Sequence, residues 1–138
     1  MYTYIYIYIY RELNTDADSL ANRHADTWRL EPFAKPASFG RAFFDGSRHD
    51  DKTGFGWVVF TSEDPTTDSR DIWSNVATRS VAISPEATIT AAELEAASSL
   101  VSFFVAYYEG YSAALKEIQR HRSLDYAAVR ILKLANMV

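Results

Sequence analysis

Phe43-Phe44-Asp45-Gly46-Ser47 is the stretch on which the predicted fold depends. The apolar residues that follow Arg41 indicate a strand over 41–44, Gly46 and Ser47 are typical of a turn, and residues 54–60 have the pattern of the returning strand of a hairpin. An acidic side chain at the end of an apolar strand is held in place by the sheet. Asp45 is therefore the first candidate for a metal ligand, although aspartate before glycine is also frequent in plain turns.

The segments on both sides of this hairpin predict an α/β domain. Tyrosine and isoleucine alternate strictly over residues 2–10, which is the period of a strand. Asn14 is a suitable N-cap for a helix that reaches about Trp28, and Gly110 is a suitable end for a long apolar helix that begins near Ala91. In chain order the sequence predicts a strand (2–10), a helix (14–28), a linker (31–40), the hairpin (41–60), a strand (72–83), the long helix (91–108), a polar helix-prone segment (112–121) and a closing amphipathic helix (124–138).

The composition fits one globular domain over residues 1–138, since 48% of the residues are hydrophobic and 14% are aromatic. Disulfides and cysteine-based zinc sites are excluded because the chain has no cysteine. A net charge of -4 argues against a protein that coats nucleic acid nonspecifically, but not against an enzyme that uses a local patch and bound cations. The sequence has no signal-peptide pattern and no apolar run of roughly 20 residues, so we expect a soluble, intracellular protein without membrane contact.

Three windows of the sequence resemble the ribonuclease H family. The first, residues 41–47 with 54–59, is similar to the first two strands of the family. The second, residues 88–97, is similar to its threonine-led turn and the glutamate-bearing start of its first helix. The third is Tyr10-Arg11-Glu12-Leu13-Asn14-Thr15-Asp16-Ala17-Asp18-Ser19-Leu20-Ala21-Asn22, which resembles its last strand and last helix, with the signature Asn-x-x-Ala-Asp-x-Leu-Ala. The resemblance implies a ribonuclease H-like mixed sheet flanked by helices, with the Asp45 strand at its centre.

The family's last strand and helix stand first in this chain. Residues 1–30 correspond to the C-terminal strand and helix of the family, residues 31–40 to a linker, and residues 41–138 to the family's N-terminal part. Two explanations are open. The domain is circularly permuted, which requires its ends to lie close together, or the chain was cut across a tandem array of such domains.

The resemblance implies that Asp45, Glu93 and Asp18 are catalytic carboxylates that bind metal. Such carboxylates hold two divalent ions for phosphodiester cleavage, and Mg²⁺ fits because it prefers oxygen ligands, with Mn²⁺ as the alternative. The fourth carboxylate of the family would fall near residues 113–117, which contain no aspartate. The nearest later candidate is Asp125, which begins the predicted closing helix.

The function implied by the resemblance is hydrolysis of the RNA strand in RNA–DNA hybrids. Candidate contacts to the phosphates of the nucleic acid are Arg41, Ser47, Arg48 and Lys52. The alternative function is a catalytically inactive remnant, or a module that binds nucleic acid or another partner. A further alternative is a homo-oligomer that forms through the N-terminal Tyr-Ile strand.

Each acidic candidate also has an ordinary structural interpretation. Glu93 follows Thr90 at the spacing of a capping box, so it could only cap the long helix. Asp18 could be a solvated helix residue. Asp125 could be a first-turn acid that is stabilised by the helix dipole.

Overall fold

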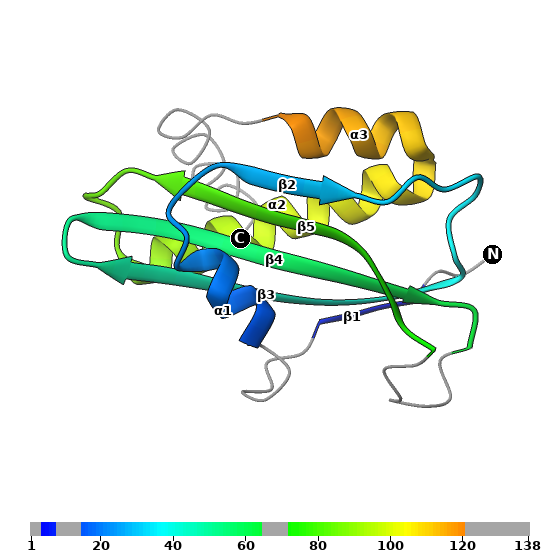
Figure 1. The fold of residues 1–138 in the computed structure, drawn as a ribbon, viewed down its shortest axis with the longest axis horizontal. Coiled ribbons are helices and arrows are strands. Elements are labelled where there is room, and N and C mark those ends of the chain that lie inside the picture. The colour runs from blue at the N-terminus through cyan, green and yellow to red at the C-terminus, as the bar shows by residue number, and fades with distance from the viewer. Residues whose placement is uncertain (1–3, 8–14, 65–71, 121–138) are drawn as a thin grey trace, which may run out of the picture.

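The computed structural model of the protein describes residues 4–7, 15–64 and 72–120. These residues form a five-stranded sheet, in the strand order β1-β3-β4-β5-β2, and helices on both of its faces (Figure 1). The elements are β1 (Tyr4–Ile7), α1 (Thr15–Ala21), β2 (Thr27–Leu30), β3 (Phe39–His49), β4 (Lys52–Ser62), β5 (Ser74–Ile83), α2 (Ile89–Glu109) and α3 (Tyr111–Gln119). The predicted α/β class, with a mixed sheet flanked by helices, is thereby confirmed.

The sheet is mixed because β1 runs parallel to β3, whereas the other neighbouring strands are antiparallel. β4 occupies the middle of the strand order, so the expectation that the Asp45 strand is central is wrong. The Asp45 strand, β3, lies between β4 and β1. The described part of β1 pairs only with the first residues of β3, from Phe39 to Ala42.

The hairpin turns later than the sequence predicts. β3 continues without interruption through Gly46 and Ser47 to His49, and these residues pair with β4. Asp50 and Asp51 form the connection, and Asp50 has a φ of 53°. Aspartate tolerates this left-handed conformation better than most residues, so the turn needs no glycine. Asp45 therefore lies inside a long strand instead of at its end.

Helix α1 is shorter than the predicted helix. It ends at Ala21, and residues 27–30 form β2, which pairs antiparallel with β5. His24 lies in the connection with a φ of 50°. Local sequence favours a helix through Trp28, but β2 gains backbone hydrogen bonds to an otherwise open edge of β5, and such tertiary pairing commonly overrides weak helix propensity.

Helices α2 and α3 pack on one face of the sheet and α1 packs on the other (Figure 1). The larger core lies between the sheet and α2, where Trp57, Phe103, Phe104 and Leu100 are almost completely buried. The smaller core lies beneath α1 and contains Ala17, Leu20, Phe43 and Val58. The two faces of the sheet are therefore buried by elements from opposite ends of the described chain.

The long helix α2 has different capping from that predicted. Its N-cap is Thr88, whose side chain accepts a hydrogen bond of 3.1 Å from the backbone N–H of Ala91, so Thr90 lies inside the helix. Gly110 ends the helix as expected, with its N–H bonded to the Ala106 carbonyl at 3.2 Å. Glu93 is consequently not the partner in a capping box with Thr90, and its ordinary interpretation as a cap is wrong.

The region after α2 is helical where a further strand would be needed for the fourth carboxylate. Residues 111–119 form α3, which buries Ala114 and Ile118 against the core. Asp125 and the predicted closing helix lie outside the described residues.

Helix α2 is long and apolar enough to cross a bilayer by length and composition alone. Nine of its residues are buried, among them Ala92, Leu100 and Phe104, so it is the core helix of a globular domain. This arrangement agrees with a soluble protein.

Candidate functional site

Asp45 is half-buried on the face of β3 that is covered by α1. It pairs directly with Gly56 of β4, and residues opposite each other in an antiparallel pair project to the same face. Gly56 carries no side chain, and α1 occupies the space that one would fill. The described part of β1 ends opposite Ala42, so this carboxylate lies where β3 has no described strand on its other side.

Two glycines of β4 allow α1 to pack closely against the sheet, and this packing places Asp18 near Asp45. A Cβ atom on Gly56 would lie 2.4 Å from the Cβ of Leu20, and one on Gly54 would lie 3.0 Å from the carbonyl oxygen of Ala21. Any side chain at these positions would push the helix away from the sheet. Ser80 of β5 adds a buried hydrogen bond, donating its hydroxyl to the Leu20 carbonyl at 2.6 Å. A helix of seven residues is marginal by itself, so these contacts supply most of its stability.

Gly46 has the equivalent role on the opposite face, where it brings Glu93 to the site. A Cβ atom on Gly46 would lie 2.7 Å from the backbone nitrogen of Glu93 and 2.9 Å from the Cβ of Ala92. The first turns of α2 therefore rest against β3 at the residue that follows Asp45. Glu93 is exposed and is near enough to Asp45 to raise the pKa of its carboxyl group.

The pKa of Asp45 is raised to about 6. Burial is the largest cause, followed by a side-chain hydrogen bond with Asp18, and the negative charges of Asp18 and Glu93 add to it. The backbone N–H of Gly46 donates to Asp45 Oδ1 at 2.9 Å and acts in the opposite direction, because it stabilises the charged form. Asp18 and Glu93, which come from two different helices, thus both disfavour ionisation of the Asp45 carboxyl group.

The donor set suits an oxygen-preferring divalent cation. No three histidine, aspartate or glutamate side chains of the described ranges are arranged so that they could hold a metal ion as they stand. Asp18 and Glu93 are exposed, however, so their side chains can change rotamer toward Asp45 without disturbing the core. A cation bound here would offset the repulsion between these acids and would lower the pKa of Asp45 again.

The residues predicted to contact nucleic acid fall into two groups. Arg41 and Ser47 are buried, with 9% and 4% of their surfaces exposed. The Arg41 guanidinium lies 4.5 Å from the centre of the Trp73 ring, and Ser47 donates to Asn22 Oδ1 and lies 3.3 Å from His24 Nε2. Arg48 and Lys52 are exposed beside the β3–β4 turn. Only these last two are placed where a phosphate could reach them.

Sequence reasoning did not identify the residues that position the site. Gly54 and Gly56 are two residues apart, so both leave the same face of β4 without a side chain. This spacing could have indicated that a helix packs closely on that face. Gly46 gave the opposite signal, because glycine after aspartate suggests a turn. Asp125, the proposed fourth carboxylate, lies outside the described residues.

Comparison of this chain with family models, with curated proteins and with solved structures finds no match.

Proposed function

We propose that this protein is a ribonuclease H-like, metal-dependent endonuclease that hydrolyses the RNA strand of RNA–DNA hybrids. The observation that carries the proposal is the meeting of Asp45, Asp18 and Glu93 from three separate elements, with the pKa of Asp45 raised to about 6. A strongly shifted acid that lies near other acids from distant parts of the chain is more typical of a functional site than of a structural one.

The order of the elements supports the assignment of the last strand and last helix of the ribonuclease H family to the N-terminal part of this chain. β1 joins the sheet parallel to β3, and α1 follows it onto the face that Asp45 shares. This arrangement accommodates either a circular permutation or a cut across a tandem array, because in both cases residues 1–30 supply the missing strand and helix. The Asn-x-x-Ala-Asp signature contributes Asp18 in the proposed site.

Asp45, Asp18 and Glu93 would hold Mg²⁺, or Mn²⁺, in a two-metal site. Such ions supply Lewis acidity for phosphodiester hydrolysis when they are bound. The protein itself fixes Asp45 on a strand and leaves Asp18 and Glu93 on helix surfaces. Recognition of RNA would rest on contacts to the 2′-hydroxyl and on the shape of the hybrid.

The test is cleavage of a labelled RNA–DNA hybrid by the intact chain with Mg²⁺, with Asp45→Asn as the inactive variant. Asparagine keeps an oxygen that can accept from the Gly46 N–H, so the strand should stay intact. We expect cleavage that Asp45→Asn reduces at least 100-fold, and that increases from pH 5 to pH 8 as Asp45 ionises. Metal binding is measured separately as a rise in melting temperature with Mg²⁺, which should be larger at pH 8 than at pH 5. A folded protein that shows neither effect would contradict the proposal.

An inactive binding module is the second candidate. It is favoured by α3, which occupies residues 111–119 where the family would place a strand leading to the fourth carboxylate. In that case the hybrid binds, but neither Mg²⁺ nor Mn²⁺ produces cleavage, and Asp45→Asn leaves the affinity for the hybrid unchanged.

A further inference from the structure

Helix α2 carries an apolar stripe on the side that is turned away from the sheet. Leu94, Val101 and Val105 are 45%, 50% and 57% exposed. At about 100° of rotation per residue they fall within about 40° of one another, whereas Phe103 of the core lies about 180° from Leu94. These three residues, which we call the α2 stripe, therefore form a continuous line on the outer side of the helix.

The α2 stripe is unusual because no charged residue interrupts it. The positions between its members on the same side of the helix are Ala97 and Ser98. The exposed acids of α2, Glu93 and Glu109, lie outside it. A helix side that meets only water usually carries charged and polar residues, so we expect this one to be covered.

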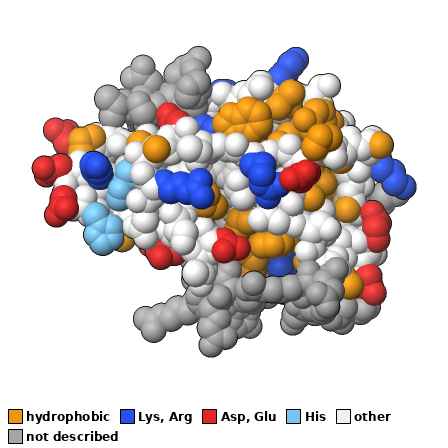
Figure 2. Space-filling model, viewed as in Figure 1, with side chains coloured by type: hydrophobic (Ala, Val, Ile, Leu, Met, Phe, Trp, Pro, Cys, Tyr) orange, Lys and Arg blue, Asp and Glu red, His pale blue; other side chains and the backbone are white. Residues whose placement is uncertain are grey.

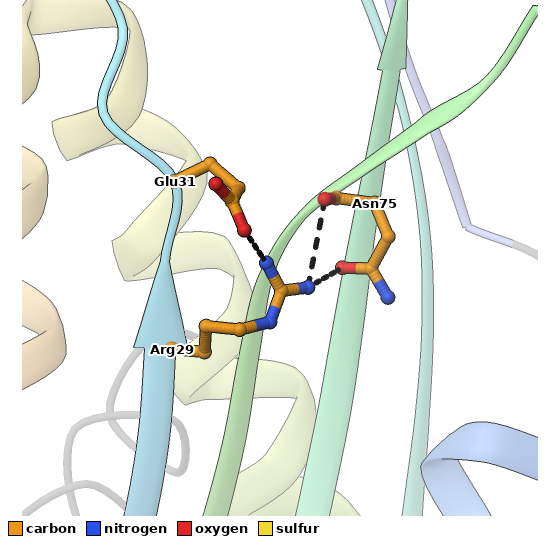
Figure 3. A network of polar contacts seen from close by, with 3 residues as sticks. All are labelled: Arg29, Glu31 and Asn75. Carbon is orange, nitrogen blue, oxygen red and sulfur yellow. Dashed lines mark hydrogen bonds and ion pairs between the residues drawn. The ribbon is translucent and has the colours of Figure 1, made fainter.

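On the other face of the molecule, polar groups satisfy one another. Figure 2 shows Lys and Arg side chains interspersed with Asp and Glu side chains over the face that carries α1 and β2. In the groove between these elements and β5, the guanidinium of Arg29 is ion-paired with Glu31 and donates to Asn75 Oδ1 at 2.6 Å (Figure 3). That face is stable in contact with water, whereas the α2 stripe offers water no hydrogen-bonding side chain.

The chain itself contains a segment that matches the stripe. Residues 124–138 are predicted to form an amphipathic helix, and they lie outside the described residues. The predicted apolar face of this helix consists of Leu124, Ala128, Ile131, Leu132 and Ala135. A helix of this length would be about 22 Å long, and the stretch of α2 from Leu94 to Val105 extends over about 17 Å. The segment is therefore long enough to cover the whole stripe.

The end of α3 places this segment within reach of the α2 stripe. After Gly110 the chain turns back, and α3 packs along α2 (Figure 1). The nine residues of α3 return over about 14 Å, so Gln119 lies beside the middle part of α2. Residues 120–123 can span about 13 Å, and the axes of neighbouring helices are about 8–10 Å apart. This link is therefore long enough to bring residue 124 onto the next side of α2.

We propose that residues 124–138 pack as an amphipathic helix on the α2 stripe. An isolated helix of this length is marginal in water, so burial against the stripe would supply the stability that it lacks. Since α2 also carries Glu93, the docked segment would hold the helix that brings this acid toward Asp45. The inference does not depend on the proposed function.

A second copy of the chain is a poorer occupant of the stripe. Each partner in a standard protein–protein interface contributes roughly 800 Å², which three half-exposed aliphatic side chains do not provide. A segment of the same chain needs less area, because its tether gives it a high effective concentration at the stripe. The stripe therefore fits an intramolecular partner.

The first test measures hydrogen exchange of the full chain by mass spectrometry, with Val101→Gln as the variant. Glutamine is a better helix former than valine, so α2 should stay intact while the stripe loses apolar surface. We expect peptides from residues 124–138 to exchange more slowly than an unstructured chain by about tenfold or more. Val101→Gln should reduce this protection by about three- to fivefold. Ile89→Gln is the matched control and should leave the protection unchanged, because Ile89 is 49% exposed on the same helix but lies about 140° from Leu94.

The second test uses the absence of cysteine from the chain. Ser98→Cys combined with Ala128→Cys places one thiol on the outer side of α2 and the other on the predicted apolar face of the segment. A short bismaleimide should link these two thiols within one chain. Ser19→Cys combined with Ala128→Cys is the control and should not be linked, because Ser19 is exposed on α1, on the other face of the sheet.

The proposal is overturned if residues 124–138 of the wild type exchange as fast as an unstructured chain, or if Val101→Gln has no larger effect than Ile89→Gln. Equal linking of the two cysteine pairs also overturns it. Protection that rises with protein concentration, together with a dimer mass by light scattering, would assign the stripe to a second copy of the chain instead.

Discussion

Asp45 is the residue at which the electrostatic cost of the site is concentrated. Its pKa of about 6 lies above the ordinary value of 3.8, so the folded protein binds this proton more tightly than the unfolded chain does. The contribution of Asp45 to stability is therefore greatest below pH 3.8 and is lost as the pH rises through about 6. Because Asp45 is only half-buried, solvent screening limits the loss to about 1 kcal/mol.

Asp45→Asn should consequently stabilise the protein at neutral pH in the absence of divalent metal. We expect its melting temperature to exceed that of the wild type by a few degrees at pH 7.5, with the difference vanishing near pH 4. Differential scanning calorimetry in EDTA across this range measures it. Asp16→Asn, on the helix that carries Asp18, is the control and should give a difference from wild type that does not change between pH 5 and pH 7.5. An Asp45→Asn effect that is independent of pH would contradict the raised pKa of Asp45.

At the scale of the elements, glycines in the strands determine how closely the helices approach the sheet. Gly46 admits the start of α2, whereas Gly54 and Gly56 admit α1. These positions fix the places of Glu93 and Asp18 relative to Asp45 without contributing any functional group. Helix placement and site geometry are therefore coupled through the strand backbone.

Gly46→Ala should push the start of α2, and Glu93 with it, away from β3 and Asp45. The new Cβ would lie 2.7 Å from the Glu93 nitrogen, a backbone atom that cannot turn away, so we expect a loss of about 1–3 kcal/mol in the free energy of unfolding. The Mg²⁺-dependent rise in melting temperature should decrease as well, because Glu93 moves.

Gly40→Ala is the matched control for this substitution. Its Cβ would lie 2.6 Å from Cε1 of the Phe104 ring, on the same strand and against the same helix but away from Glu93. We expect lower stability with an unchanged response to Mg²⁺. Equal loss of the Mg²⁺ response in both variants would show that Gly46 has no special role in positioning the site.

At the scale of the whole molecule, a buried polar contact joins the sheet to α2 within a largely apolar core. Trp57 Nε1 donates to the Ser99 hydroxyl at 2.9 Å, and the Trp57 ring stacks obliquely on Phe103 with ring centres 4.8 Å apart. Removing the acceptor would leave an indole N–H buried without its partner. Such a group costs more than the net value of a hydrogen bond.

Ser99→Ala should therefore lower the free energy of unfolding by about 1–3 kcal/mol, measured by urea denaturation. Ser98→Ala provides the control, since the neighbouring serine does not accept the Trp57 bond, and it should change stability by less than about 0.5 kcal/mol. A loss for Ser99→Ala no larger than that of Ser98→Ala would mean that water replaces the hydroxyl.

The sequence by itself determined the α/β class, the hairpin, the long helix α2 and its end at Gly110. Each of these depends on a local signal, because periodicity records which face of a segment is buried and glycine marks where a helix can stop. The resemblance to the ribonuclease H family also pointed to Asp45, Glu93 and Asp18 as candidate carboxylates. It did so from short motifs, without specifying distances.

The tertiary structure alone decided the length of α1, the existence of β2, the position of β4 in the middle of the sheet and the extension of β3 to His49. Strand pairing and helix seating depend on partners far away in the chain, so no local pattern encodes them. Gly46 illustrates the difference, because its sequence context suggests a turn although it lies inside a strand. Glycine is needed there because α2 packs so closely that a Cβ atom on residue 46 would lie 2.7 Å from the Glu93 nitrogen.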